Sequence, residues 1–256
     1  MRKTHHSITS EKTLPAVRKY YPNAVNIDRI TDELFDIFKS ELGLKPNQII
    51  HADSICSDDV NNIEYPEHAR QMLGPFNLGG LCGFPFTGVT GITAFAHHVP
   101  KNGAVMLYYG PHIGISKQGE VGKLLRVGQN IHSSCCGAVN AAIKKLLKNE
   151  IKKNEITELD YQQNIIEQIL LKHKERIEKA EHPIFEATEV LYNAIEDRIN
   201  ELATKTDYPC KNIILVGGII INSDYDAGSY FECRTFKIIN TGTNKVKDVI
   251  SLIDIS

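Results

Sequence analysis

Two apolar runs separated by segments of helical spacing constrain the fold of this chain more than any other feature. They are AVMLYY at 104–109 and IILVGGIII at 213–221. Runs without polar alternation are typical of strands covered on both faces of a sheet. Because helical segments are expected between the strands, the pattern predicts an α/β fold with a mainly parallel sheet flanked by helices.

A helix marks the start of the predicted domain. Apolar residues recur every four positions over 27–42, where Asn26 can cap the helix and Gly43 can end it. We expect residues 1–25 to form a loosely attached N-terminal arm, followed by a single α/β domain over 26–256.

The remaining elements of the predicted domain alternate in type. Alternating Glu and Lys residues over 150–205 are typical of two amphipathic helices, divided at Pro183. The other expected elements are strands over 48–52 and 230–239, the second antiparallel or at an edge, and helices over 87–99 and 135–148.

Charge and composition exclude several classes of protein. Lys and Arg number 29 against 31 Asp and Glu, which argues against a nucleic-acid partner. No apolar run approaches the roughly 20 residues of a membrane span. Residues 1–12 lack the apolar core of a secretory signal, and the six cysteines suggest no disulfide framework. We expect a cytoplasmic protein, with import into an organelle left open, whose cysteines and histidines bind metal or do chemistry.

Three possible zinc ligands fall where α/β folds place their sites, beyond the carboxyl ends of strands. Cys56 and His112 each follow a predicted strand, and Cys136 lies in the first turn of a predicted helix. Two thiolates and one imidazole fill three of the four tetrahedral positions of Zn²⁺. That is the ligand count of a catalytic site, which keeps water in the fourth position. No Cys-x-x-Cys pair offers the fourth ligand of a structural site.

The charge of this ligand set constrains the chemistry. Two thiolates cancel the charge of Zn²⁺, so a bound water is polarised less than in a three-histidine site. Asp58 can accept a hydrogen bond from that water and orient it, or can bind zinc itself and block the fourth position. Arg70 and Arg126 are the candidate partners that could hold Asp58 off the metal.

Several motifs resemble those of one known family. In chain order they are CSDDVN at 56–61, GPFNLGGLCGFPFTGVTG at 74–91, AHHVP at 96–100, GPHIGIS at 110–116, LRVGQ at 125–129 and SSCCGA at 133–138. Together they resemble the limiting-carbon-dioxide-inducible B (LCIB) family, a group of algal and bacterial proteins related in fold to β-carbonic anhydrases and also called the theta class. The similarity runs from about residue 26 to residue 240.

The resemblance implies a Rossmann-like fold, a homodimer, and zinc held by Cys56, His112 and Cys136. The choice of Cys136 over Cys135 follows from aligning the family's Cys-Gly pair with Cys136 and Gly137.

The resemblance also matches Asp58 to the aspartate in the Cys-x-Asp-x-Arg motif of β-carbonic anhydrases. Val60 stands where that motif has arginine, so an arginine partner of Asp58 must come from elsewhere or be absent. Members of the family look alike around the zinc yet are not all active. The resemblance therefore implies the site more strongly than it implies turnover.

The glycine-rich segment 74–100 matches no nucleotide-binding pattern, and we interpret it as a wall that lets the backbone approach the zinc. His98 could export the proton that hydration releases, or could satisfy carbonyls at a helix end. Apolar side chains of this segment could line a pocket for carbon dioxide, or could form plain core or a dimer contact; they are Leu81, Phe84, Phe86, Val89 and Phe95.

Three hypotheses follow. The first is zinc-dependent reversible hydration of carbon dioxide to bicarbonate, with Asp58 orienting the attacking group. The second is a catalytically silent, zinc-containing partner protein that binds carbon dioxide or bicarbonate, favoured if Asp58 binds zinc or has no arginine nearby. The third is a hydrolase with Cys135 or Cys136 as nucleophile and His112 as base, favoured by a metal-free, alkylation-sensitive protein.

Overall fold

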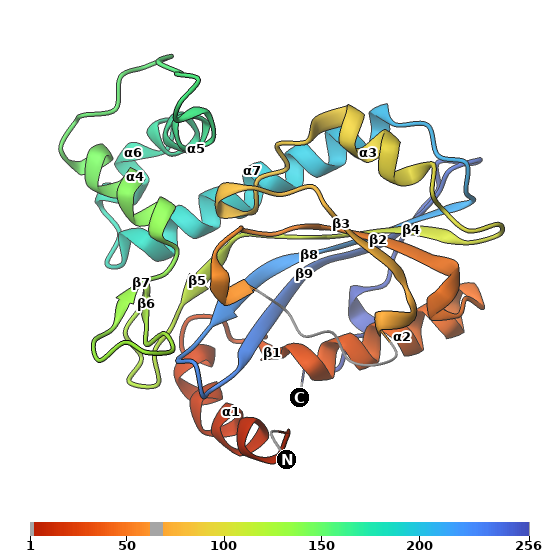
Figure 1. The fold of residues 1–256 in the computed structure, drawn as a ribbon, viewed down its shortest axis with the longest axis horizontal. Helices are drawn as coiled ribbons and strands as arrows, with labels where there is room; N and C mark the ends of the chain where they lie inside the picture. The colour runs from red at the N-terminus through yellow and green to blue at the C-terminus, as the bar shows by residue number, and fades with distance from the viewer. Residues whose placement is uncertain (1–2, 62–68, 256) are drawn as a thin grey trace.

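A mixed, mainly parallel sheet runs through the centre of the protein (Figure 1), as predicted. The computed structural model describes residues 3–61 and 69–255. Four neighbouring strands are parallel to one another, and the strands beyond them are antiparallel. The parallel strands are, in spatial order, β3 (Leu73–Asn77), β2 (Ile49–Ser54), β4 (Ala104–Tyr109) and β8 (Asn212–Asn222); β9 (Ser229–Asn240) follows, and β1 (Val25–Asn26) and β10 (Val246–Asp248) both pair with it.

Helices cover both faces of this sheet (Figure 1). None of the described helices combines the length and hydrophobicity needed to cross a bilayer. The helices are α1 (Lys3–Arg18), α2 (Ile27–Leu42), α3 (Gly88–Ala96), α4 (Gly137–Leu147), α5 (Tyr161–Leu171), α6 (Lys174–Glu178) and α7 (Pro183–Lys205).

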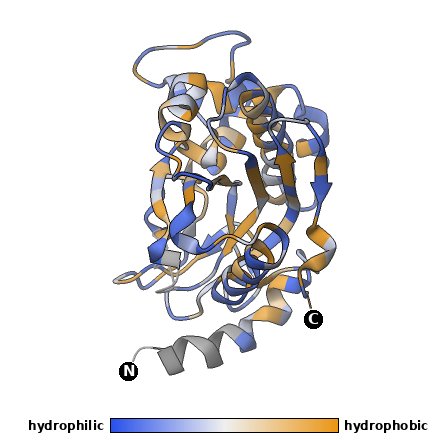
Figure 2. Ribbon diagram, turned by 90° about the vertical axis from the view of Figure 1, so that its right-hand side faces the viewer, coloured by the Kyte–Doolittle hydropathy of each residue, from blue (hydrophilic) through white to orange (hydrophobic). Residues whose placement is uncertain are grey.

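Side chains along the buried strands point alternately to the two faces of the sheet, and each face has its own hydrophobic core. In β8, Ile214 and Val216 pack on the face covered by α2, whereas Ile213 and Leu215 pack on the face covered by α3 and α7. Because side chains of a strand alternate between faces, a strand between two helical layers needs apolar residues at every position. Figure 2 shows the hydrophobic residues gathered along the central strands.

The first predicted helix forms with the expected ends. The side-chain oxygen of Asn26 accepts a hydrogen bond from the backbone N–H of Asp28 at 2.9 Å, which caps α2. Gly43 ends the helix in the left-handed conformation, with φ 66°, where glycine meets no steric penalty.

The segment over 150–205 differs from the prediction of two helices, since it holds α5, α6 and α7. Pro183 starts α7 as expected, because the first turn of a helix does not need the N–H that proline lacks. The residues directly before α5 are not helical; Ile151 packs against the core, but Ile156 and Leu159 are exposed.

The N-terminal segment is attached more firmly than the expected loose arm over 1–25, of which residues 1 and 2 lie outside the described residues. Val17, Tyr21 and Ala24 are fully buried in the core formed with α4 and α7. Strand β1 then pairs with β9. In the described part of this segment, buried apolar residues therefore attach the chain to the core of the domain.

The carboxyl ends of β2 and β4 lie side by side, and the chain continues from β4 along the second half of β8 as β5 (His112–Gly114). A close approach at Gly110 allows this, because a Cβ there would lie 1.8 Å from the backbone oxygen of Gly218. The short antiparallel pair β6 (Lys123–Leu124) and β7 (Ser133–Ser134) then leads into α4. Residues 56, 112 and 136 are thereby brought to one edge of the sheet.

Candidate metal centre

Four segments bring cysteine and histidine together at this edge. Cys56 follows β2, His112 begins β5, and Cys136 caps α4 rather than lying in its first turn. The fourth segment is the 3-10 turn η4 (Leu81–Gly83), which contributes Cys82. All four side chains are buried, with 4% exposure or less.

The predicted ligand atoms lie at distances that suit one metal ion. The ligand atoms of Cys56, His112 and Cys136 all lie within 4.8 Å of one another. The two sulfurs of Cys56 and Cys136 are 3.9 Å apart. Two sulfurs bound tetrahedrally to zinc, each with a bond of about 2.3 Å, would be about 3.8 Å apart. The pair is therefore spaced for zinc without a large rearrangement.

The histidine offers one nitrogen for a metal. His112 Nδ1 lies 2.8 Å from the side-chain oxygen Oδ1 of Asn222. The other ring nitrogen, Nε2, is buried and makes no hydrogen bond within the described part of the chain. A buried polar atom without a partner is costly, and a metal ion would satisfy its lone pair. The residues present thus fit a metal of the kind that thiolates and imidazole bind.

Contacts between the thiols of the cluster shift their pKa values in opposite directions. Hydrogen bonds from the thiols of Cys56 and Cys82 lower the pKa of Cys136, and the same contact with Cys136 raises the pKa of Cys56. The backbone N–H of Cys82 also lies 3.2 Å from the sulfur of Cys56, where it can donate to a thiolate. Zinc binding needs both sulfurs as thiolates, so a metal must displace any proton that Cys56 and Cys136 hold.

An arginine holds the predicted aspartate beside the cluster. Nη2 of Arg126 donates to both carboxylate oxygens of Asp58, each at 3.0 Å. The same guanidinium bonds Asp59 and Ser133, so its position is fixed from several sides. Burial alone would lower the pKa of Arg126, but the hydrogen bonds and negative charge around it, from Asp58 first and also from Asp59, together raise it. Of the two candidate partners, Arg126 makes the pair.

Asp58 lies close enough to His112 for both side chains to bind the same metal ion. Its Oδ2 lies 3.9 Å from Nε2 of His112. Asp58, His112 and Cys135 form a second group whose ligand atoms lie within 4.8 Å of one another. The Cys135 sulfur is 3.5 Å from Nδ1 of His112, and burial raises the pKa of this thiol. Geometry alone thus offers two overlapping donor sets that share His112.

Only some of the predicted pocket residues lie near the cysteines. Leu81, Phe84 and Phe86 pack against the core that contains Cys56, Cys82 and Cys136, and the rings of Phe84 and Phe86 have centroids 5.1 Å apart. Phe95 is fully buried under α3 against other apolar residues, and Val89 is 42% exposed. The structure therefore brings the first three side chains to the cysteines, and not the last two.

Two further predicted residues lie away from the cluster. His98 is exposed and follows α3, six residues before β4 begins. It therefore precedes the amino end of β4, a six-residue strand about 20 Å long at 3.3 Å per residue, and the carboxyl end of this strand leads to the cluster. Arg70 is exposed on the 3-10 turn η3 (Ala69–Gln71).

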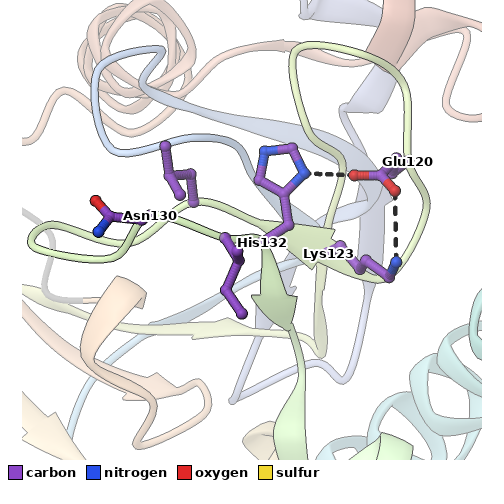
Figure 3. A pocket seen from close by; sticks show the side chains of 6 residues that line it. Glu120, Lys123, Asn130 and His132 are labelled. Carbon is purple, nitrogen blue, oxygen red and sulfur yellow. Dashed lines mark hydrogen bonds and ion pairs between the residues drawn. The ribbon is translucent and has the colours of Figure 1, made fainter.

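An open surface pocket lies on the β6–β7 segment (Figure 3). His132 points toward Glu120, which also pairs with Lys123. These polar side chains contact one another, and none of the predicted site residues lines the pocket. Its lining residues are Glu120, Lys123, Leu125, Asn130, Ile131 and His132.

The comparisons agree with this geometry. Residues 24–240 match the family model of limiting CO2-inducible proteins B/C beta carbonic anhydrases, which covers most of the chain. The chain belongs to this family. No curated protein sequence matches the chain.

Solved structures of the family share the fold. The crystal structure of PtLCIB4, a homolog of the limiting CO2-inducible protein LCIB, superposes with a TM-score of 0.80 at 27% identity, and the match covers 93% of this chain and 100% of that one. The crystal structure of LCIB itself has a TM-score of 0.69 at 19% identity, covering 93% and 97% of the two chains, and shows the likeness of fold alone.

Sequence reasoning missed two contributors to the cluster. Cys82 is not among the predicted ligands, yet it is fully buried and its backbone N–H lies 3.2 Å from the sulfur of Cys56. Asn222 was not singled out, although a polar residue directly after the apolar run at 213–221 stands where α/β folds place functional groups. Its position directly after a predicted strand could therefore have identified Asn222 as a candidate site residue.

Proposed function

We propose that this protein is a zinc-dependent carbonic anhydrase, which hydrates carbon dioxide reversibly to bicarbonate. The observation that carries the proposal is the pair between Arg126 and Asp58, at the edge of a buried Cys–His cluster. A carboxylate held by arginine would be less free to bind zinc and to block the position that water needs.

Cys56, His112 and Cys136 would hold the zinc. Bound there, zinc would supply a Lewis acid that makes a water molecule reactive near neutral pH. Two thiolates reduce that effect, so surrounding groups must draw negative charge from the sulfurs. The backbone N–H of Cys82 does so at Cys56, and the amino end of α4 does so at Cys136.

Asp58 would orient the reacting water. Both oxygens of Asp58 accept hydrogen bonds from Arg126, and each oxygen keeps further lone-pair capacity. A carboxylate fixed in this way accepts an O–H hydrogen bond and thereby aims the oxygen lone pair of the water at the substrate carbon. Arg126 gives this carboxylate a partner of opposite charge other than the metal.

Leu81, Phe84 and Phe86 would receive carbon dioxide. They are partly buried and pack against the core of the cysteines. Carbon dioxide has no dipole, so apolar walls hold it without competing for the polar groups that act on water. Bicarbonate is charged and is held poorly by the same walls, which favours its release.

The other two hypotheses predict different geometry. A silent protein is favoured when no arginine lies near Asp58, whereas Arg126 bonds both of its oxygens. A cysteine hydrolase needs a thiol that an acyl substrate can reach, whereas Cys135 is fully buried and Cys136 is 2% exposed. Burial also raises the pKa of Cys135, which disfavours its thiolate.

The test compares two adjacent aspartates that Arg126 bonds. Asp58→Asn should lower the stopped-flow rate of carbon dioxide hydration while zinc remains stoichiometric by metal analysis. Asp59→Asn is the matched control, because Asp59 is 71% exposed and should be dispensable. Purified protein with one zinc per chain and no hydration above the buffer rate would refute the proposal in favour of a silent protein. Protein that stays metal-free and is inactivated by alkylation would favour the hydrolase.

We further propose that the protein is cytoplasmic. The six cysteines form no disulfide with one another within the described residues, and a reducing compartment keeps thiols available as ligands.

We also propose that the protein is a homodimer, as the resemblance to the family implies. Light scattering coupled to gel filtration should give twice the chain mass, and a monomer at micromolar concentration would contradict the dimer.

A further inference from the structure

One side chain outside the donor set fixes the orientation of the histidine. Asn222 ends β8, is 2% exposed, and places its Oδ1 at 2.8 Å from Nδ1 of His112. Its Nδ2 lies 3.2 Å from the backbone oxygen of Val60 and 3.3 Å from Oγ of Ser229. Its own backbone oxygen accepts from the N–H of Ile115 at 2.9 Å. Both the backbone and the amide are therefore held.

The hydrogen-bond chemistry leaves one assignment of protons. A backbone carbonyl only accepts, so the group of Asn222 that faces Val60 must be the NH₂. The amide oxygen then faces His112 and can only accept, so Nδ1 of His112 must carry the proton. Nε2 is the nitrogen whose lone pair remains for a metal, and it is the nitrogen without a hydrogen bond.

We propose that Asn222 is a positioning residue for the metal centre, which fixes Nδ1 of His112 as the proton carrier and presents Nε2 to the metal. The inference rests on the zinc site of the proposed function and deepens it. Metal-binding histidines generally donate their second N–H to such a partner, and loss of the partner costs about 10- to 100-fold in metal affinity or activity.

The same arrangement also distinguishes Cys135 from Cys136 as a possible metal ligand. The sulfur of Cys135 lies 3.5 Å from Nδ1 of His112 and 3.9 Å from Oδ1 of Asn222, so it shares the edge of the ring that is already protonated. A metal on that edge would have to break the bond to Asn222. Asn222 thus favours the donor set with Cys136 over the set with Cys135.

Zinc affinity measures the proposed role directly. Asn222→Leu removes the acceptor at similar volume and should weaken zinc binding about 10- to 100-fold in competition with a chromophoric chelator. Asn222→Asp keeps an acceptor oxygen toward His112 and should stay within about tenfold of the wild-type affinity. Asn212→Leu, at the opposite end of β8, is the matched control for damage to the strand and should bind zinc like the wild type.

A second measurement does not depend on zinc. Nitrogen-15 NMR of the metal-free wild type should show a proton on Nδ1 of His112 that exchanges slowly with solvent, and Asn222→Asp should retain it. If the wild type binds no zinc but shows this proton, the proposed function fails and the role of Asn222 in orienting the ring stands. An unprotonated Nδ1 in the wild type would overturn the inference, even if Asn222→Leu does not fold. Equal zinc affinity of the wild type and Asn222→Leu would overturn it as well.

Discussion

Replacement of Arg126 by methionine should lower activity and at the same time strengthen zinc binding. Arg126 holds Asp58 through two hydrogen bonds of 3.0 Å, and their side chains are only 17% and 14% exposed. Oδ2 of Asp58 already lies 3.9 Å from Nε2 of His112. Once released, the carboxylate can move onto the metal and fill the position that water needs.

The magnitude follows from the anchoring that Arg126 supplies. Charge-assisted hydrogen bonds contribute about 1.5–3 kcal/mol net, and here they compete with ligation by Asp58. Loss of about 1.5–3 kcal/mol changes the ratio of free to ligating carboxylate by about 10- to 150-fold. We expect the hydration rate of Arg126→Met to fall by about that factor, measured by stopped flow with one zinc per chain.

Two further variants separate this explanation from general damage to the site. Arg70→Met, which changes the other candidate arginine, should keep the wild-type rate, because Arg70 is exposed on η3. Addition of Asp58→Asn to Arg126→Met should return the zinc affinity toward the wild-type value, because the competing carboxylate is gone. Wild-type activity in Arg126→Met would refute the reasoning. Loss of zinc from Arg126→Met would also refute it, because Arg126 would then support the ligands rather than restrain Asp58.

Three other predictions concern the ligands and pH. Cys136→Ser should lose stoichiometric zinc by metal analysis while Cys135→Ser keeps it, and the reverse result would move the site to the second donor set. The hydration rate should rise between about pH 6.5 and 8.5, because two thiolates leave the reacting water less acidic than the ~7 of a typical catalytic zinc site, and a flat or falling rate would contradict this. Burial lowers the pKa of His51 to about 4, so between that value and 6.5 the unfolded chain binds the extra proton. The free energy of unfolding should therefore fall by up to about 3 kcal/mol on acidification across this range; denaturant titrations should show a smaller fall for His51→Gln, and an equal fall would exclude His51 as the cause.

The sequence predicted the fold because the strongest patterns in the chain are local. The unbroken apolar runs at 104–109 and 213–221 form β4 and β8, and the four-residue spacing of 27–42 forms α2 between Asn26 and Gly43. The ends of other elements moved, because helix α4 begins only after Cys136 and the strand expected over 48–52 continues to Ser54. Local patterns specify that an element exists better than they specify where it ends.

The candidate site could be predicted in part for the same reason. Cys56 and His112 follow strands, and parallel strands end at one edge of the sheet, so their approach is a consequence of topology. The partner of Asp58 did not follow from any local pattern. Arg126 is 68 positions along the chain from Asp58, and its approach depends on how the β6–β7 segment lies against the loop after β2.

By itself, the amino-acid sequence determined the α/β class and the three residue types that suit zinc, because each depends on composition or spacing along the chain. The family followed from the resemblance of several motifs in chain order. The tertiary structure decided which arginine restrains Asp58, that Asn222 faces Nδ1 of His112, and that His98 lies at the other end of the sheet. These arrangements involve residues far apart in the sequence, and no repeating pattern along the chain predicts them. Only the packing of the folded chain specifies such contacts.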